Sequence, residues 1–115
     1  METKLPGLAG FDAYTVSREF FARVWKACSR LPESEHKDQL VRAAESILRN
    51  IGEAHAVLGA DRKRRFRLAA AEASECVASL DILEIRGAIP AETIGELRAL
   101  LDRVCAMLYR LSRRG

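Results

Sequence analysis

Long hydrophobic runs are missing from this sequence of 115 residues. No stretch of roughly 20 apolar residues occurs, so no segment is expected to span a membrane. The residues up to Gly10 include a lysine but lack an apolar core of signal-peptide length, which makes a cytoplasmic location the expectation.

Cysteine and aromatic residues are also scarce. The three cysteines, Cys28, Cys76 and Cys105, are odd in number and far apart. A disulfide framework or a metal site would need closer pairs, such as C-x-x-C, so we expect reduced thiols packed as small hydrophobes. Aromatic residues make up only 6% of the chain. RNA-binding signatures with exposed stacking residues are absent.

Residues for catalysis or metal binding do not form a recognisable set. A carboxylate-bridged metal site in a helical bundle needs a Glu-x-x-His motif on each of two helices. Residues 33–36 are the only match, and they fall at a connection between predicted helices. Glu53 and His55 have the wrong spacing for such a motif. We therefore expect no enzymatic activity, no metal and no cofactor.

Helical periodicity dominates the sequence, in which hydrophobic residues make up 49% and charged residues 30%. The strongest pattern lies between Asp38 and Ala54, where apolar residues alternately four and three apart form one seam of a helix. This seam consists of Leu40, Ala44, Ile47, Ile51, Ala54 and Leu58. No strand-like alternation of useful length occurs. The sequence predicts one all-α domain over residues 1–115, with residues 1–10 as a flexible arm.

Capping and turn residues divide the chain into four predicted helices. The first should cover residues 12–30 and end before Pro32. The second should begin after an N-cap at Ser34 and reach residue 58, and the third should run from a cap at Asp61 to residue 86, before Gly87. The fourth should begin at Pro90. Their predicted inward faces carry Tyr14, Phe21, Val24, Cys28 and Leu31, widened by Phe20 and Trp25, in the first; Phe66, Ala69, Ala73, Cys76, Leu80 and Leu83 in the third; and Ile94, Leu97, Leu101, Val104, Leu108 and Leu111 in the fourth.

Short connections between such helices predict an up-down-up-down antiparallel four-helix bundle. Three of the helices carry more apolar residues than one narrow seam needs. The candidates for a subunit interface are Val41, Leu48, His55, Ile82, Ile85, Leu100 and Met107. A wide core face would account for the surplus equally well, and the residues alone leave both alternatives open.

A longer pattern runs through most of the chain. Phe11 and Asp12 open the first predicted helix, Leu31 and Pro32 close it, and residues 39–54 read QLVRAAESILRNIGEA. A basic run follows at residues 62–66, and then a helix rich in Ala, Ser and Glu. With these features the chain resembles the small four-helix-bundle proteins encoded within intervening sequences of bacterial 23S ribosomal RNA genes. It is also similar to the related accessory proteins of diversity-generating retroelements.

The resemblance implies a ring-shaped homo-oligomer, typically a pentamer, without established enzymatic activity. It also implies nucleic acid as a partner, or a reverse transcriptase or another nucleic-acid-processing protein. The chain departs from the family pattern at three places: Leu48 or Arg49 stands where a proline is usual, Gly52 replaces an alanine, and Ala54 replaces a glycine. A straight second helix that extends to Leu58 is therefore expected.

Charge patterning supplies the main functional clue, although the net charge is only +3. In the predicted topology, the start of the third helix and the end of the fourth lie at the same end of the bundle. The candidate nucleic-acid-binding residues are Arg62, Lys63, Arg64, Arg65, Arg67, Arg110, Arg113 and Arg114. The opposite end should gather Glu33, Glu35, Asp38, Asp81, Glu84, Glu92 and Glu96.

The basic run at residues 62–67 lies where the helix dipole opposes positive charge by about 0.3–1 kcal/mol per residue. Attraction for phosphate would account for that placement, and so would a solvated run that favours solubility. We predict a non-enzymatic oligomeric module that binds the nucleic-acid backbone with low sequence specificity. The alternative is a structural or protein-interaction oligomer that does not bind nucleic acid.

Overall fold

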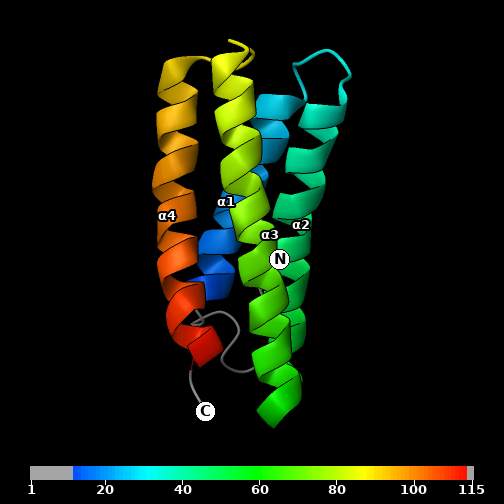
Figure 1. Ribbon diagram of the computed structural model, residues 1–115, viewed down its shortest axis with the longest axis vertical. Coiled ribbons are helices and arrows are strands. Elements are labelled where there is room, and N and C mark those ends of the chain that lie inside the picture. The colour runs from blue at the N-terminus through cyan, green and yellow to red at the C-terminus, as the bar shows by residue number, and fades with distance from the viewer. Residues whose placement is uncertain (1–11, 114–115) are drawn as a thin grey trace.

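The computed structural model describes residues 12–113, which form four α-helices joined by short connections. The helices are α1 (Asp12–Cys28), α2 (Glu35–His55), α3 (Gly59–Ile85) and α4 (Ala91–Arg113). They run alternately up and down, and each packs against two neighbours in the order α1, α2, α3, α4 and back to α1 (Figure 1). Among the described residues no strand occurs. The predicted all-α four-helix bundle is therefore found.

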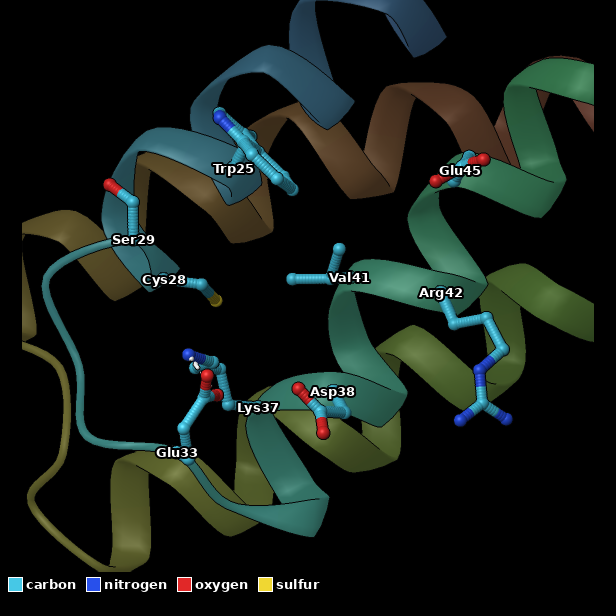
Figure 2. Close-up of a pocket in the computed structure, with 9 residues that line it drawn as sticks. All are labelled: Trp25, Cys28, Ser29, Glu33, Lys37, Asp38, Val41, Arg42 and Glu45. Atoms are coloured by element: carbon cyan, nitrogen blue, oxygen red, sulfur yellow. Dashed lines mark ion pairs between the residues drawn. The ribbon is translucent and has the colours of Figure 1, made fainter.

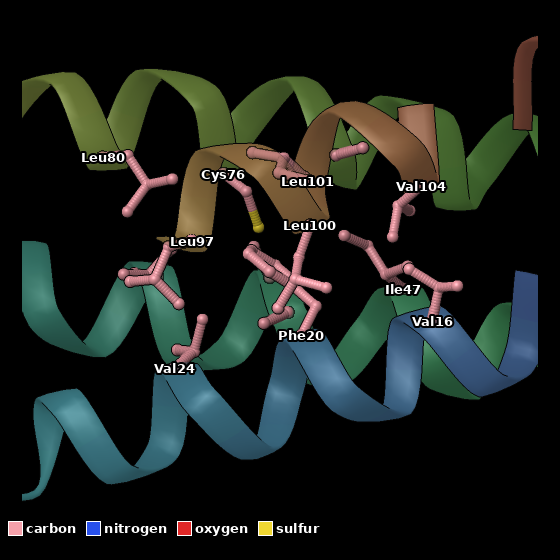
Figure 3. Close-up of a cluster of buried hydrophobic side chains, with 14 of the residues drawn as sticks. Val16, Phe20, Val24, Ile47, Cys76, Leu80, Leu97, Leu100, Leu101 and Val104 are labelled. Atoms are coloured by element: carbon pink, nitrogen blue, oxygen red, sulfur yellow. The ribbon is translucent and has the colours of Figure 1, made fainter. Parts of the chain in front are cut away.

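The core fills the space between the four helices along their length (Figure 3). The predicted seam of α3 is buried throughout, and those of α2 and α4 are buried except at their last members, Leu58 and Leu111. Cys28 and Cys76 are buried free thiols, and Cys105 is partly buried, so all three act as packing residues. The 3-4 spacing of apolar side chains therefore accounts for most of the core.

The inward face of α1 agrees with the prediction only in part: Phe20, Val24 and Cys28 are buried as expected, whereas Val16 was missed. The buried side chains follow the line Val16, Phe20 and Val24, and include Ala13, Ser17 and Cys28. Tyr14 and Phe21 are only partly buried, and Trp25 is 60% exposed. The sequence carries two apolar stripes side by side on this helix, and the predicted face combined residues from both. Contact with both α2 and α4 turns the stripe of Val16, Phe20 and Val24 inward.

The boundary between α2 and α3 also corrects the prediction. The helix α2 ends at His55, and Leu58 is 78% exposed, so the expected extension to Leu58 is wrong. Gly59 has φ +60° and directly begins α3, so Leu58 is the N-cap and Asp61 is a first-turn residue. Glycine adopts this left-handed conformation without steric strain, which lets the chain reverse here. The Asp61 carboxylate does not cap α3; it lies in the first turn, where the positive end of the helix dipole stabilises a negative charge.

The other helix ends agree closely with the capping residues. The backbone N–H of Lys37 donates to the Ser34 side chain at 3.1 Å, as expected for an N-cap. Gly87 has φ +69° just after α3. The carbonyl of Pro90 accepts from Ile94 N–H, and α4 begins one residue later, at Ala91. The predicted arm at residues 1–10 lies outside the described residues. Within residues 12–113 no helix is long and apolar enough to cross a membrane.

Candidate nucleic-acid interface

The start of α3 and the end of α4 lie at the same end of the bundle, the lower end in Figure 1. We call the cations at this end the basic pole. Its described members come from both helices, as predicted: Arg62, Lys63, Arg64, Arg65, Arg67, Arg110 and Arg113. Arg114, the eighth predicted member, lies outside the described residues.

Arg62 is occupied by the backbone of its own chain. Its Nε donates to the carbonyl oxygens of Ala54 and Val57, both at 3.0 Å, and its Nη2 donates to that of His55 at 3.4 Å. These carbonyls belong to the end of α2 and the turn after it, where helical partners are missing. A cation is also favourable at the negative end of a helix dipole. Arg62 therefore closes α2, a structural role that the sequence prediction missed.

Arg65 is partly neutralised by α2. Its Nη1 lies 2.9 Å from the Glu53 carboxylate and donates to the Asn50 side-chain oxygen at 3.4 Å. Asn50 in turn donates from Nδ2 to the Ser46 carbonyl at 3.0 Å. These contacts tie the first turns of α3 to the last turns of α2. Arg65 is thus less available to a ligand than its position in the basic run suggested.

Five cations of the basic pole remain without such partners. Among residues 12–113, no carboxylate lies within ion-pair distance of Lys63, Arg64, Arg67, Arg110 or Arg113. All but Lys63 are exposed. The Arg113 guanidinium stacks over the Tyr109 ring, 4.9 Å from its centroid, and donates to the Tyr109 hydroxyl. Tyr109 is 60% exposed, so an aromatic ring joins these cations at the surface.

The predicted acidic residues do lie at the opposite end of the bundle, but cations among them offset much of their charge. Lys37 pairs with Glu33 at 2.6 Å, and Arg98 bridges Asp81 and Glu84 at 2.8 and 2.6 Å. Hydrogen bonds, first to Asp81 and then to Glu84, raise the Arg98 pKa. Three further exposed cations belong to this end: Lys26, Arg30 and Arg86. The prediction considered only the acidic residues at this end and not the basic ones. The charge separation along the bundle is therefore weaker than expected.

The predicted interface residues separate into several locations. Leu100 is only 8% exposed and points into the core (Figure 3), and Met107 packs against the core. For these two the wide-core alternative is the better interpretation. Val41 and Leu48 lie on α2 and are partly exposed, while Ile82 is partly exposed and Ile85 is 84% exposed on α3. His55, at the end of α2, is partly exposed and makes an interaction within the chain.

An open groove of about 1020 Å³ runs between α1 and α2, and we call it the α1–α2 groove. Its lining is mostly apolar and includes Tyr14, Phe21 and Trp25 from α1 and Leu48, Gly52 and Ala56 from α2. The rings of Phe21 and Trp25 lie 6.3 Å apart and are tilted by 50°. Tyr14, Phe21 and Trp25 are seven and four residues apart, a spacing that places them on one stripe. That spacing was the available signal for the groove, and it was assigned to the core.

A second hollow of about 460 Å³ continues from this groove past Trp25 (Figure 2). Trp25 and Val41 face each other across it, and the Glu33–Lys37 ion pair lies near the Cys28 thiol. Burial raises the Cys28 pKa, and the nearby Lys37 charge offsets this only in part. A raised pKa disfavours the nucleophilic thiolate. Within residues 12–113, no group of three or more His, Cys, Asp or Glu side chains is placed to hold a metal ion.

Comparison with known proteins gives a family and a fold. A family model described as 23S rRNA-intervening sequence protein matches residues 10–110. The chain is similar to a protein of unknown function from the S23 ribosomal protein family of Bacteroides thetaiotaomicron VPI-5482, known from a crystal structure. The two share 22% sequence identity with a TM-score of 0.83, over 89% of this chain and 99% of that one. No curated protein matches the chain.

Proposed function

Because this chain belongs to the family of 23S rRNA-intervening sequence proteins, we propose that it is a non-enzymatic binding module that presents its basic pole to nucleic acid. It would act as a ring-shaped homo-oligomer, with five copies suggested by the resemblance. The observation that supports this most is the group of unpaired cations at the meeting point of α3 and α4. Either RNA or DNA fits this chemistry, alone or held by a processing enzyme such as a reverse transcriptase.

The placement of these cations argues against a purely structural role. Lys63 and Arg64 lie in the first turns of α3, where the helix dipole disfavours positive charge. No carboxylate among the described residues lies within ion-pair distance of either side chain. A phosphate backbone would supply the missing negative charge, with counterion release as the driving force. A parallel ring would repeat the basic pole on one face and so multiply individually weak contacts.

The expected recognition is directed at the backbone and not at base sequence. Lys63, Arg64, Arg67 and Arg110 offer charge without a fixed hydrogen-bonding frame, and contacts of this kind position a protein without reading bases. Tyr109 is the one exposed aromatic ring described beside these cations. Stacking on it would favour single strands modestly over duplexes.

A binding titration at several salt concentrations tests the proposal. We would use labelled single-stranded and duplex RNA and DNA oligonucleotides of mixed sequence. The triple variant Lys63→Glu, Arg64→Glu, Arg67→Glu should bind at least about tenfold more weakly. The slope of log affinity against log salt should also fall by about 2–3 units, because about one counterion is released for each lost phosphate contact. Arg62 and Arg65 are left intact, since replacing them would disturb the fold.

The far end of the molecule provides a matched control. The variant Lys26→Glu, Arg30→Glu, Arg86→Glu changes the net charge by the same amount, at exposed cations away from the basic pole. It should retain affinity and salt slope. Equal losses in both triple variants would mean that only net charge matters. Salt-insensitive binding, or none, would support the alternative of a protein-interaction oligomer.

A further inference from the structure

We infer that copies of this chain join head to tail, with the outward face of α3 from one copy seated in the α1–α2 groove of the next. This inference rests on the proposed function only for the claim that the chain assembles. It adds which two surfaces meet and what kind of symmetry they impose.

The first surface is the α1–α2 groove. It is a wide groove open to solvent, a shape that can accept the side of a helix. Trp25 protrudes from it with 60% of its surface exposed, next to the Phe21 ring. Exposed aromatic side chains that cluster in a groove mark the residues that dominate many protein interfaces.

The second surface is an outward stripe on α3, which we call the α3 stripe. It consists of Leu68, Ala71, Ala78, Ile82 and Ile85, at intervals of three, seven, four and three residues. This is the heptad spacing of a helix that packs against another helix. The buried seam of α3, which includes Phe66, Ala73 and Leu80, lies on the other side. Four of the five residues of the α3 stripe are exposed in the single chain, and Ile85 is 84% exposed.

The two surfaces are complementary in shape. Ala71 and Ala78 are exposed and small, so they leave room on α3 for the large Trp25 and Phe21 rings. Small residues let helices approach to about 8–10 Å between axes. Leu68 and Ile82 flank these alanines and would contact the apolar walls of the groove, including Leu48.

The two surfaces are also complementary in charge. Four charged residues line the α1–α2 groove, and three of them are paired within the chain: Arg49 with Glu45 at 2.6 Å, and Glu53 with Arg65 at 2.9 Å. The fourth, Arg18, has no ion-pair partner among residues 12–113. Glu75, in the middle of the α3 stripe, likewise has none among them. The groove thus has an unpaired cation and the stripe an unpaired anion.

The α1–α2 groove and the α3 stripe lie on different faces of the bundle. A single two-fold interface brings together the same patch of both copies, so it cannot cover both surfaces. They form a heterologous contact, in which each copy offers its stripe to one neighbour and its groove to the other. Repetition of that contact produces a ring if the rotation between copies closes, and a filament if it does not. The chain therefore carries both halves of its own interface.

A mixing experiment tests this arrangement, with solution mass measured by sedimentation in the absence of nucleic acid. The wild-type protein should be larger than its 12.8 kDa chain. Trp25→Glu damages the groove and leaves the stripe intact, while Ala78→Arg damages the stripe and leaves the groove intact. Each variant alone should be a folded monomer by circular dichroism, because both positions are exposed. An equimolar mixture should form a one-to-one heterodimer and nothing larger, because only one intact interface remains.

Ala106→Arg, at an exposed position on α4, serves as the control and should keep the wild-type mass. A monomeric wild-type protein would overturn the inference. So would an Ala78→Arg variant that keeps the wild-type mass, since the groove would then pair with something else. Folded variants that fail to form the heterodimer would overturn it too. A monomeric wild-type protein would also remove the ring from the proposed function, whereas the other two results would overturn only this inference. None of the three changes the salt-dependent titration that tests the basic pole.

Discussion

Arg62 stands in the middle of a basic run, yet its guanidinium faces the carbonyl oxygens at the end of α2. Replacing it with alanine should lower the free energy of unfolding by about 1–3 kcal/mol, because charged hydrogen bonds to the carbonyls of Ala54, His55 and Val57 are lost. Urea denaturation measures this change. Arg64→Ala is the matched control, and its effect should stay within about 0.5 kcal/mol. Equal stability of the two variants would contradict the capping role of Arg62.

Cys76 should make stability depend on alkaline pH. Burial raises the Cys76 pKa to about 12, helped by the charges of Glu72, Glu75 and Cys105. In the unfolded chain a thiol ionises at about pH 8.5. Between these two pKa values the unfolded state has lost a proton that the folded state keeps. The free energy of unfolding is therefore highest below the unfolded-state pKa and decreases as pH rises towards the folded-state pKa. The limiting slope is about 1.4 kcal/mol per pH unit.

Urea denaturation from pH 8 to 10.5 or so checks this for the wild type and for Cys76→Ala. The alanine variant loses core packing at every pH but lacks the titrating thiol. The stability difference between the two proteins should therefore shrink as pH rises. Parallel curves would mean that the Cys76 thiol ionises alike in both states.

At the scale of the element, Gly52 is the residue of α2 that helix propensity would most readily improve. A Cβ at this position would meet the Tyr14 ring at 3.5 Å, an ordinary van der Waals contact. Gly52→Ala should therefore raise the free energy of unfolding by about 0.5–1 kcal/mol.

Gly87 offers the opposite case, because its φ of +69° is strained for any L side chain. Gly87→Ala should destabilise by about 1–2 kcal/mol. Thermal unfolding of both variants measures the difference, and a loss at Gly52 would show that the Tyr14 ring cannot accommodate the methyl group.

At the scale of the whole molecule, assembly should make thermal stability depend on protein concentration. A subunit interface that forms only in the folded state stabilises that state by mass action. The wild-type melting temperature should rise across a roughly 100-fold range of concentration. For Ala78→Arg it should stay constant, since the α3 stripe no longer fits the α1–α2 groove. A wild-type melting temperature that is independent of concentration would argue for a monomer.

The sequence alone was sufficient for the class of fold and for most of the core. The seams of α3 and α4, the N-cap at Ser34 and the turn at Gly87 all follow from local spacing and backbone preference. These features depend on residues three to four apart on one helix, so they can be read without knowing what the helix packs against. The family resemblance was also readable there, and the match over residues 10–110 confirms it.

Only the tertiary structure decided which of two adjacent stripes on α1 turns inward, because Val16–Phe20–Val24 and Tyr14–Phe21–Trp25 both fit the spacing of one helix face. The tertiary structure also gave the cations of the basic run different roles. Arg62 and Arg65 contact α2, whereas Arg64 and Arg67 face solvent. Local sequence determined that these side chains are charged or apolar and where their helices begin and end. Which of them find partners depended on the neighbouring helices, since burial and ion pairing are set by residues distant in the chain.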